Sequence, residues 1–183
     1  FTWQPFWDLA GNMPEVNSLA IYSLEGACWW QFPTTAQSAA AAAAPSSSGM
    51  AAPVKPAERP PSSLSAIKGP EIRRVLFGWR SKEGLTAADS PFKQTTLSGN
   101  LWEFTSMSSD SAGQVAVARL MKPKDSESWM TGATRTYSAS KTTAIFRRTQ
   151  KMMIVASTDD AYSIQKVMDA VNEAADALSA YSF

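Results

Sequence analysis

The chain of 183 residues has no histidine and a single cysteine, Cys28. One cysteine excludes an intramolecular disulfide, and the lack of histidine removes the most common nitrogen ligand of zinc sites. It also excludes Ser-His, Cys-His and other histidine-based acid–base chemistry. We therefore expect a protein that is not an enzyme and that needs no metal or cofactor.

Long apolar runs and a strong net charge are also missing. No stretch of about 18 apolar residues is present, which predicts that there is no transmembrane segment, and no signal or transit peptide is recognisable at Phe1. The formal net charge is +1, and no known nucleic-acid-binding motif occurs. Nucleic acid is therefore not an expected partner.

What the chain has is a large apolar content, interrupted by one biased segment. Apolar residues make up 44% of the chain, enough for a single domain over residues 1–183 with a real core. Residues 34–65 are rich in alanine, proline and serine and poor in large apolar side chains. Such a composition does not offset the entropy cost of ordering, so we interpret 34–65 as a flexible insertion within the domain.

Both ends of the chain carry patterned segments. Residues 2–8 read TWQPFWD, and residues 19–30 read LAIYSLEGACWW, in which Glu25-Gly26 suits a tight hairpin. Residues 141–153 read KTTAIFRRTQKMM and precede an acidic pair, Asp159 and Asp160. A last helix is predicted from apolar residues at i, i+3, i+4 and i+7 spacing: Ile164, Val167, Met168, Val171, Ala174, Ala175 and Leu178.

This order of segments resembles the profilin family. Typical profilins begin near S-W-Q-x-Y, continue with a hairpin of the type A-A-I-I-G-x-D-G-x-x-W-A, and end with K-K-T, an apolar strand, an acidic pair and a last helix. In this chain Arg147, Arg148 and Thr149 occupy the K-K-T positions, and 147–183 aligns with the family without a gap. The resemblance covers about 1–33 and 66–183.

The resemblance implies an α/β (α+β) fold. We expect a profilin-like central antiparallel β-sheet with the N- and C-terminal helices packed on one face and internal helices on the other. Apolar spacing predicts an internal helix over residues 70–79, and strands are predicted at about 92–97, 101–107 and 114–120.

The resemblance also implies a site for polyproline between the terminal helices. A polyproline II helix has no backbone donors, so its partners supply flat aromatic faces and donors for its carbonyls, and tryptophan provides both. Phe6 stands where the family usually has tyrosine. The alternative interpretation is that these aromatic residues are simply core. The matching positions are Trp3, Phe6, Trp29, Tyr181 and Phe183.

Binding of actin monomers is the second activity that the resemblance implies. Candidate residues are Arg119, Lys122 and Lys166. The chain departs from the family near the start of the last helix, where the gapless alignment places Met168 and Asp169, and a two-residue gap would restore Lys166 instead.

A group of basic residues free of acids lies between residues 130 and 154. One interpretation is a solvated strand end. The other is a phosphate-binding patch, because guanidinium groups bind phosphate in a bidentate manner, and the resemblance implies a phosphoinositide head group as the ligand. The candidate residues are Arg135, Lys141, Arg147 and Arg148.

The sequence therefore predicts an actin-monomer-binding protein that also binds proline-rich proteins such as formins and regulates actin polymerisation. The resemblance implies a location in the cytoplasm, at the cytoskeleton. The alternative is a scaffold or structural subunit of a larger complex that keeps the profilin-type fold but has lost actin binding. The insertion, an extended connection over residues 121–140 and the changes at Met168 and Asp169 favour that alternative.

Overall fold

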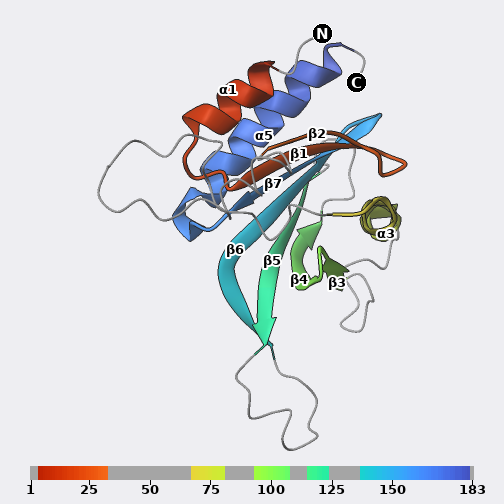
Figure 1. The fold of residues 1–183 in the computed structure, drawn as a ribbon, viewed down its shortest axis with the longest axis vertical. Coiled ribbons are helices and arrows are strands. Elements are labelled where there is room, and N and C mark those ends of the chain that lie inside the picture. The colour runs from red at the N-terminus through yellow and green to blue at the C-terminus, as the bar shows by residue number, and fades with distance from the viewer. Residues whose placement is uncertain (1–3, 33–66, 81–92, 108–114, 124–136, 182–183) are drawn as a thin grey trace, which may run out of the picture.

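The computed structural model describes residues 4–32, 67–80, 93–107, 115–123 and 137–181 (Figure 1). Its centre is one antiparallel sheet in which the strands follow the order β2-β1-β7-β6-β5-β4-β3. The helical elements are α1 (Gln4–Asn12), α3 (Gly69–Arg80), the 3-10 turn η2 (Ala161–Ser163) and α5 (Ile164–Ser179). The strands are β1 (Ser18–Ser23), β2 (Cys28–Phe32), β3 (Gln94–Leu97), β4 (Asn100–Met107), β5 (Val115–Pro123), β6 (Tyr137–Arg148) and β7 (Met152–Thr158).

The two terminal helices lie together on one face of the sheet (Figure 1). Helix α5 packs against β6, β7 and α1. Its buried residues are Val167, Val171, Ala175 and Leu178, and the other three residues of the predicted stripe, Ile164, Met168 and Ala174, are partly buried. They join Phe6 and Ala10 of α1 and the inward residues of β1, β2 and β7 in one apolar core.

Helix α3 covers the opposite face of the sheet (Figure 1). Ile72, Val75 and Leu76 of α3 pack in a second core with the alternate residues of β4, β5 and β6. Trp102 of β4 is fully buried there, and its indole Nε1 donates a hydrogen bond to the carbonyl of Leu97 at 3.3 Å. The sheet therefore separates two cores, because successive residues of a strand point to opposite faces.

The β1–β2 turn is held against the start of α3 by an unusually close backbone contact. Gly26 has a φ of +97°, and a Cβ placed on it would lie 2.5 Å from the carbonyl oxygen of Gly69. Arg73 of α3 adds a hydrogen bond of 2.7 Å from its guanidinium to the carbonyl of Glu25. This contact ties the hairpin that carries Trp29 and Trp30 to the helix on the other face.

The architecture expected from the sequence is confirmed: a central antiparallel sheet with the terminal helices on one face and α3 on the other. The expected insertion, residues 34–65, lies outside the described residues. Within the described part of the chain, no helix is long and apolar enough to cross a membrane.

Candidate functional site

Four aromatic side chains of α1 and β2 meet under the terminal helices, and we call Phe6, Trp7, Trp30 and Phe32 the aromatic cluster. The ring of Trp30 lies 5.8 Å from that of Phe6 and 5.1 Å from that of Trp7, measured between centroids. Trp7 also contacts Phe32 edge-on at 6.0 Å. Phe6, Trp30 and Phe32 are buried, whereas Trp7 is only half-buried. Trp7 therefore offers part of an aromatic surface to solvent.

A β-bulge decides which tryptophan of β2 joins this cluster. Ile21 of β1 pairs with Trp30, but the next residue, Tyr22, pairs with Cys28, so Trp29 is the extra residue of β2. Trp30 stands opposite Ile21 in the regular part of the ladder and shares its face. Trp29 falls at the bulge and is 43% exposed.

The indole of Trp30 carries a donor without a partner in the described chain. Its Nε1 is buried and has no hydrogen-bond acceptor, and the residue is only 8% exposed. Leaving a buried donor unpaired costs about 1–3 kcal/mol, so native proteins seldom keep one without a reason.

The charge around the aromatic cluster is mainly negative. Residues 4–32 carry Asp8, Glu15 and Glu25 and no lysine or arginine. The second half of α5 adds Glu173 and Asp176, also without a base. Two of these acids have ion-pair partners, Asp176 with Arg147 at 3.4 Å and Glu15 with Lys166 at 2.8 Å. A ligand with a small positive charge suits these surroundings.

Of the residues predicted to bind polyproline, one is buried, two are exposed and two lie outside the described residues. Phe6 lies in the aromatic cluster and is 2% exposed. Trp29 and Tyr181 are exposed, and Tyr181 follows the end of α5. Trp3 and Phe183 lie outside the described residues. The resemblance did not assign Trp7 or Trp30 to the site. The helical spacing of Phe6, Trp7 and Ala10 is a signal that indicates a place for Trp7 beside Phe6.

The residues predicted to bind actin do not form one group in the structure. Arg119 is exposed on β5, directly opposite Glu103 of β4. Lys122 is also exposed on β5, but strand alternation directs it to the other face of the sheet. Lys166, on the first turn of α5, is joined to Glu15 by an ion pair of 2.8 Å.

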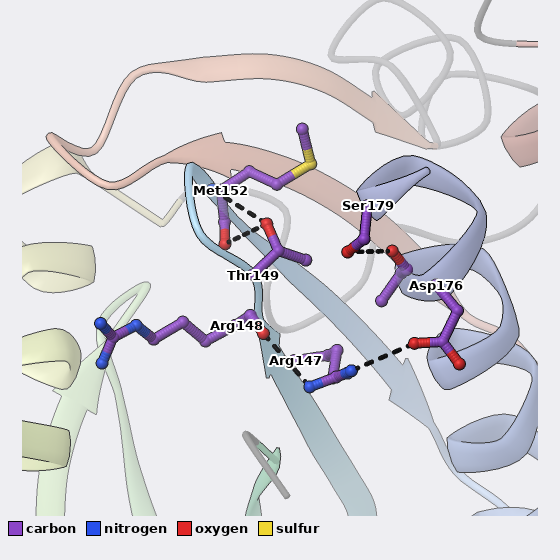
Figure 2. A network of polar contacts seen from close by, with 7 residues as sticks. Arg147, Arg148, Thr149, Met152, Asp176 and Ser179 are labelled. Atoms are coloured by element: carbon purple, nitrogen blue, oxygen red, sulfur yellow. Dashed lines mark hydrogen bonds and ion pairs between the residues drawn. The ribbon is translucent and has the colours of Figure 1, made fainter. Parts of the chain in front are cut away.

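The basic residues predicted to bind phosphate are separated by the sheet. Arg147 points to α5, where it meets Asp176, whereas Arg148 extends away on the opposite side (Figure 2). Lys141 is exposed nearer the other end of β6, and Arg135 lies outside the described residues. The phosphoinositide site therefore stays a prediction, and the placement of these three side chains does not bring them to one point.

The threonine of the profilin-like K-K-T positions has a structural role. Thr149 Oγ1 bonds both the amide and the carbonyl of Met152, at 3.2 and 3.3 Å, and its own amide donates to the same carbonyl (Figure 2). These bonds close the β6–β7 turn.

The acidic pair is also structural. The carboxylate of Asp160 accepts hydrogen bonds from the amide of Tyr162 at 2.9 Å and from Ser163 Oγ at 2.8 Å, which caps η2. Asp159 accepts a hydrogen bond from Thr142 Oγ1 of β6. The two carboxylates thus hold the turn that precedes α5.

The ion pair between Glu15 and Lys166 predicts a small acid-sensitive contribution to stability. The hydrogen bond from Lys166 holds the pKa of Glu15 below its ordinary value of 4.5. A lowered folded-state pKa adds stability above the unfolded value, and this is lost as the pH falls through the folded value. We expect Glu15→Gln to lower the unfolding free energy by at most about 1 kcal/mol at pH 7.

Urea unfolding at several values between pH 7 and pH 3 tests this expectation. The difference between wild type and Glu15→Gln should shrink below pH 4.5. Lys166→Met removes the same pair and is the matched control. A difference between wild type and Glu15→Gln that stays constant to pH 3 would contradict the assignment.

Comparison with known proteins finds solved structures that share this fold. No protein-family model matches this sequence, and no curated protein matches it. Among solved structures, mouse profilin IIa in complex with a double repeat from the FH1 domain of mDia1 matches with a TM-score of 0.60 at 13% identity. Acanthamoeba castellanii profilins IB and IA match with TM-scores of 0.56 and 0.54 at 14% and 13% identity. Each match covers 100% of both chains.

The chain has the profilin fold. At this level of identity the likeness concerns the arrangement of the sheet and its helices. In this profilin-like chain the aromatic cluster, the unpartnered indole of Trp30 and the acidic surroundings are features of its own residues.

Proposed function

We propose that this protein is a profilin-like adaptor that binds proline-rich segments at the aromatic cluster and actin monomers at another surface. The observation that carries the proposal is the Trp30 indole, a buried donor without an acceptor beside the half-buried ring of Trp7. The mouse profilin that this fold matches was solved with a repeat from an FH1 domain, which supports proline-rich proteins such as formins as partners.

The chemistry of the cluster fits a polyproline II ligand. Such a helix exposes carbonyl groups and apolar rings and has no backbone donors. Trp7 provides an aromatic face, and Trp30 provides the donor that one of these carbonyls requires. Trp29 and Tyr181, both exposed, belong to the proposed site as further aromatic faces.

Trp30→Phe is expected to weaken the binding of decaproline. The substitution keeps an aromatic ring in the cluster but removes the indole N–H, so one hydrogen bond of about 1 kcal/mol is lost. We expect the Kd to rise by about fivefold, since about 1.4 kcal/mol corresponds to a factor of ten. Isothermal titration calorimetry of wild type and variant measures the change.

Trp102→Phe is the matched control, because this indole is buried on the opposite face of the sheet and bonds Leu97. Its decaproline affinity should equal that of the wild type. Equal affinities for wild type and Trp30→Phe would remove Trp30 from the site. Failure of the folded wild type to bind decaproline would overturn the proline-binding half of the proposal.

The second candidate function, a scaffold that has lost actin binding, is favoured by the dispersed positions of Arg119, Lys122 and Lys166. A pyrene-actin assembly assay separates the two functions. An adaptor lowers the rate of spontaneous assembly in proportion to its concentration by binding monomers, whereas the scaffold leaves the rate unchanged.

A further inference from the structure

The outward side of α3 carries basic and apolar side chains together. The inward side of this helix belongs to the core, so the opposite side is formed by residues at i, i+3, i+4 and i+7 spacing. These exposed residues, which we call the α3 surface, are Pro70, Arg73, Arg74 and Phe77. Phe77 is 67% exposed. Aromatic residues and arginine are both enriched where proteins contact each other.

The α3 surface lies in a positively charged segment. Residues 68–80 contain four bases and one acid, Glu71. The carboxylate of Glu71 accepts hydrogen bonds from the amides of Lys68 and Ser98 at 2.8 and 3.4 Å. Arg74 takes part in no ion pair or side-chain hydrogen bond within the described part of the chain. Its guanidinium is therefore available to an acid of another molecule.

The outward side of α5 has the opposite charge. Ion pairs within the molecule compensate two of its charged residues, Asp176 and Lys166. Asp169 and Glu173 are exposed and keep their negative charges, since Asp169 accepts a hydrogen bond only from the neutral amide of Gln165. Among the residues that the structure describes, Glu173 has no ion-pair partner. We call Asp169, Ala170, Glu173 and Ala177 the α5 surface.

The two surfaces also match in the size of their side chains. Ala170 and Ala177 lie three residues before and four residues after Glu173, so they share its side of the helix. On α3, Arg74 and Phe77 are likewise three residues apart. When the guanidinium of Arg74 meets the carboxylate of Glu173, the small alanine side chains leave room for an aromatic ring beside the ion pair.

Within one molecule these surfaces do not meet, because α3 and α5 lie on opposite faces of the sheet (Figure 1). Between molecules their charges are complementary. We propose that the α3 surface binds the α5 surface of a second copy of this chain, with Arg74 paired to Glu173. Such a contact joins two different surfaces, so it connects copies head to tail. This inference is independent of the proposed proline-binding function and adds self-association to it.

Sedimentation velocity of the full chain measures this association. A contact between two helices is small, so we expect a Kd on the order of 10–100 µM and use concentrations from about 10 µM to about 1 mM. Two charge reversals test the contact, Arg74→Glu and Glu173→Arg. Lys141→Glu is the matched control, because Lys141 is exposed on β6 and belongs to neither surface.

The wild type is expected to form dimers and longer species as its concentration rises. An increase in salt from about 50 mM to about 500 mM should reverse this association, because salt screens exposed charges. Each charge reversal should raise the Kd by at least about tenfold, since it brings like charges together. Lys141→Glu should match the wild type.

An equimolar mixture of Arg74→Glu and Glu173→Arg should associate with a Kd within about threefold of the wild-type value. Each variant alone has like charges at the contact, whereas both contacts between unlike variants bring opposite charges together. A mixture that associates no better than either variant alone would overturn the pairing of Arg74 with Glu173. A wild type that stays monomeric at low salt would overturn the whole inference.

Two further measurements separate this inference from other interpretations. Arg74→Glu should bind decaproline as the wild type does, because α3 and the aromatic cluster lie on opposite faces of the sheet. Loss of decaproline binding in the folded wild type would concern the proposed proline-binding function alone. Sedimentation of the wild type, but not of Arg74→Glu, with vesicles of phosphatidylcholine and phosphatidylserine, in the absence of self-association, would assign the α3 surface to an anionic membrane instead.

Discussion

Gly26→Ala is expected to destabilise the protein by about 3 kcal/mol or more, since backbone strain and overpacking each cost about 1–3 kcal/mol. Gly26 has a φ of +97°, a conformation that side chains with a Cβ rarely adopt, and the added carbon would lie 2.5–2.8 Å from three backbone atoms of Gly69. Backbone cannot move aside as a flexible side chain can. Urea unfolding followed by circular dichroism measures the loss.

Gly99→Ala is the matched control. Gly99 also has a positive φ, of +77°, but a Cβ there would meet nothing within 4 Å. Only the backbone strain remains, which costs about 1–2 kcal/mol. The difference between the two variants isolates the contact between the β1–β2 turn and α3, and equal losses would show that this contact does not hold the hairpin.

Trp102→Ala is expected to lower the unfolding free energy by about 3–5 kcal/mol, a large share of the roughly 5–15 kcal/mol of a typical domain. Trp102 is 0% exposed in the core under α3. The substitution leaves a cavity and also removes the hydrogen bond from Nε1 to the carbonyl of Leu97. Thermal and urea unfolding of the purified variant measure this loss.

Trp29→Ala is the matched control, since it also removes a tryptophan but at a surface position. Trp29 is 43% exposed and is the bulged residue of the edge strand. Its loss of stability should stay below about 1 kcal/mol, as for most surface substitutions. A larger loss for Trp29→Ala than for Trp102→Ala would contradict the assignment of the two tryptophans to surface and core.

Much of the fold follows from sequence periodicity. The spacing of apolar residues predicts the last helix and the face that it buries, and Val167, Val171, Ala175 and Leu178 are buried as expected. Pro70 in the first turn and the spacing from Ile72 to Leu76 predict α3. Glu25-Gly26 predicts the first hairpin, and Gly26 indeed takes the positive φ that such a turn requires.

The candidate site is predicted less completely. The resemblance of residues 2–8 and 19–30 to profilins points to Phe6 and to Trp29. In the structure Trp30 joins the cluster instead, and Trp29 is the extra residue at the irregularity between Ile21 and Tyr22 in the pairing with β1. A bulge shifts the alternation of a strand by one residue, and no residue type in 28–32 marks it.

The basic residues illustrate the same limit. Arg147 and Arg148 are neighbours in sequence, which predicts that they belong to one basic group. In the sheet they point to opposite faces, and only Arg147 reaches Asp176 of α5 (Figure 2). Side chains of adjacent residues in a strand point to opposite faces of the sheet. Both can therefore bind one phosphate only if a third element brings them together.

The sequence by itself determined most elements of this protein, the faces that its helices bury, its profilin-like order and its lack of histidine; it placed residues 121–123 and 137–140 in a connection, whereas they extend β5 and β6. These properties depend on local spacing and composition, which each segment carries alone. Only the tertiary structure decided that Trp30 joins Phe6 and Trp7, that its indole donor lacks an acceptor, and that Gly26 lies on the backbone of Gly69. Those features depend on strand pairing and on packing between distant segments, where a shift of one residue changes which side chain faces the core.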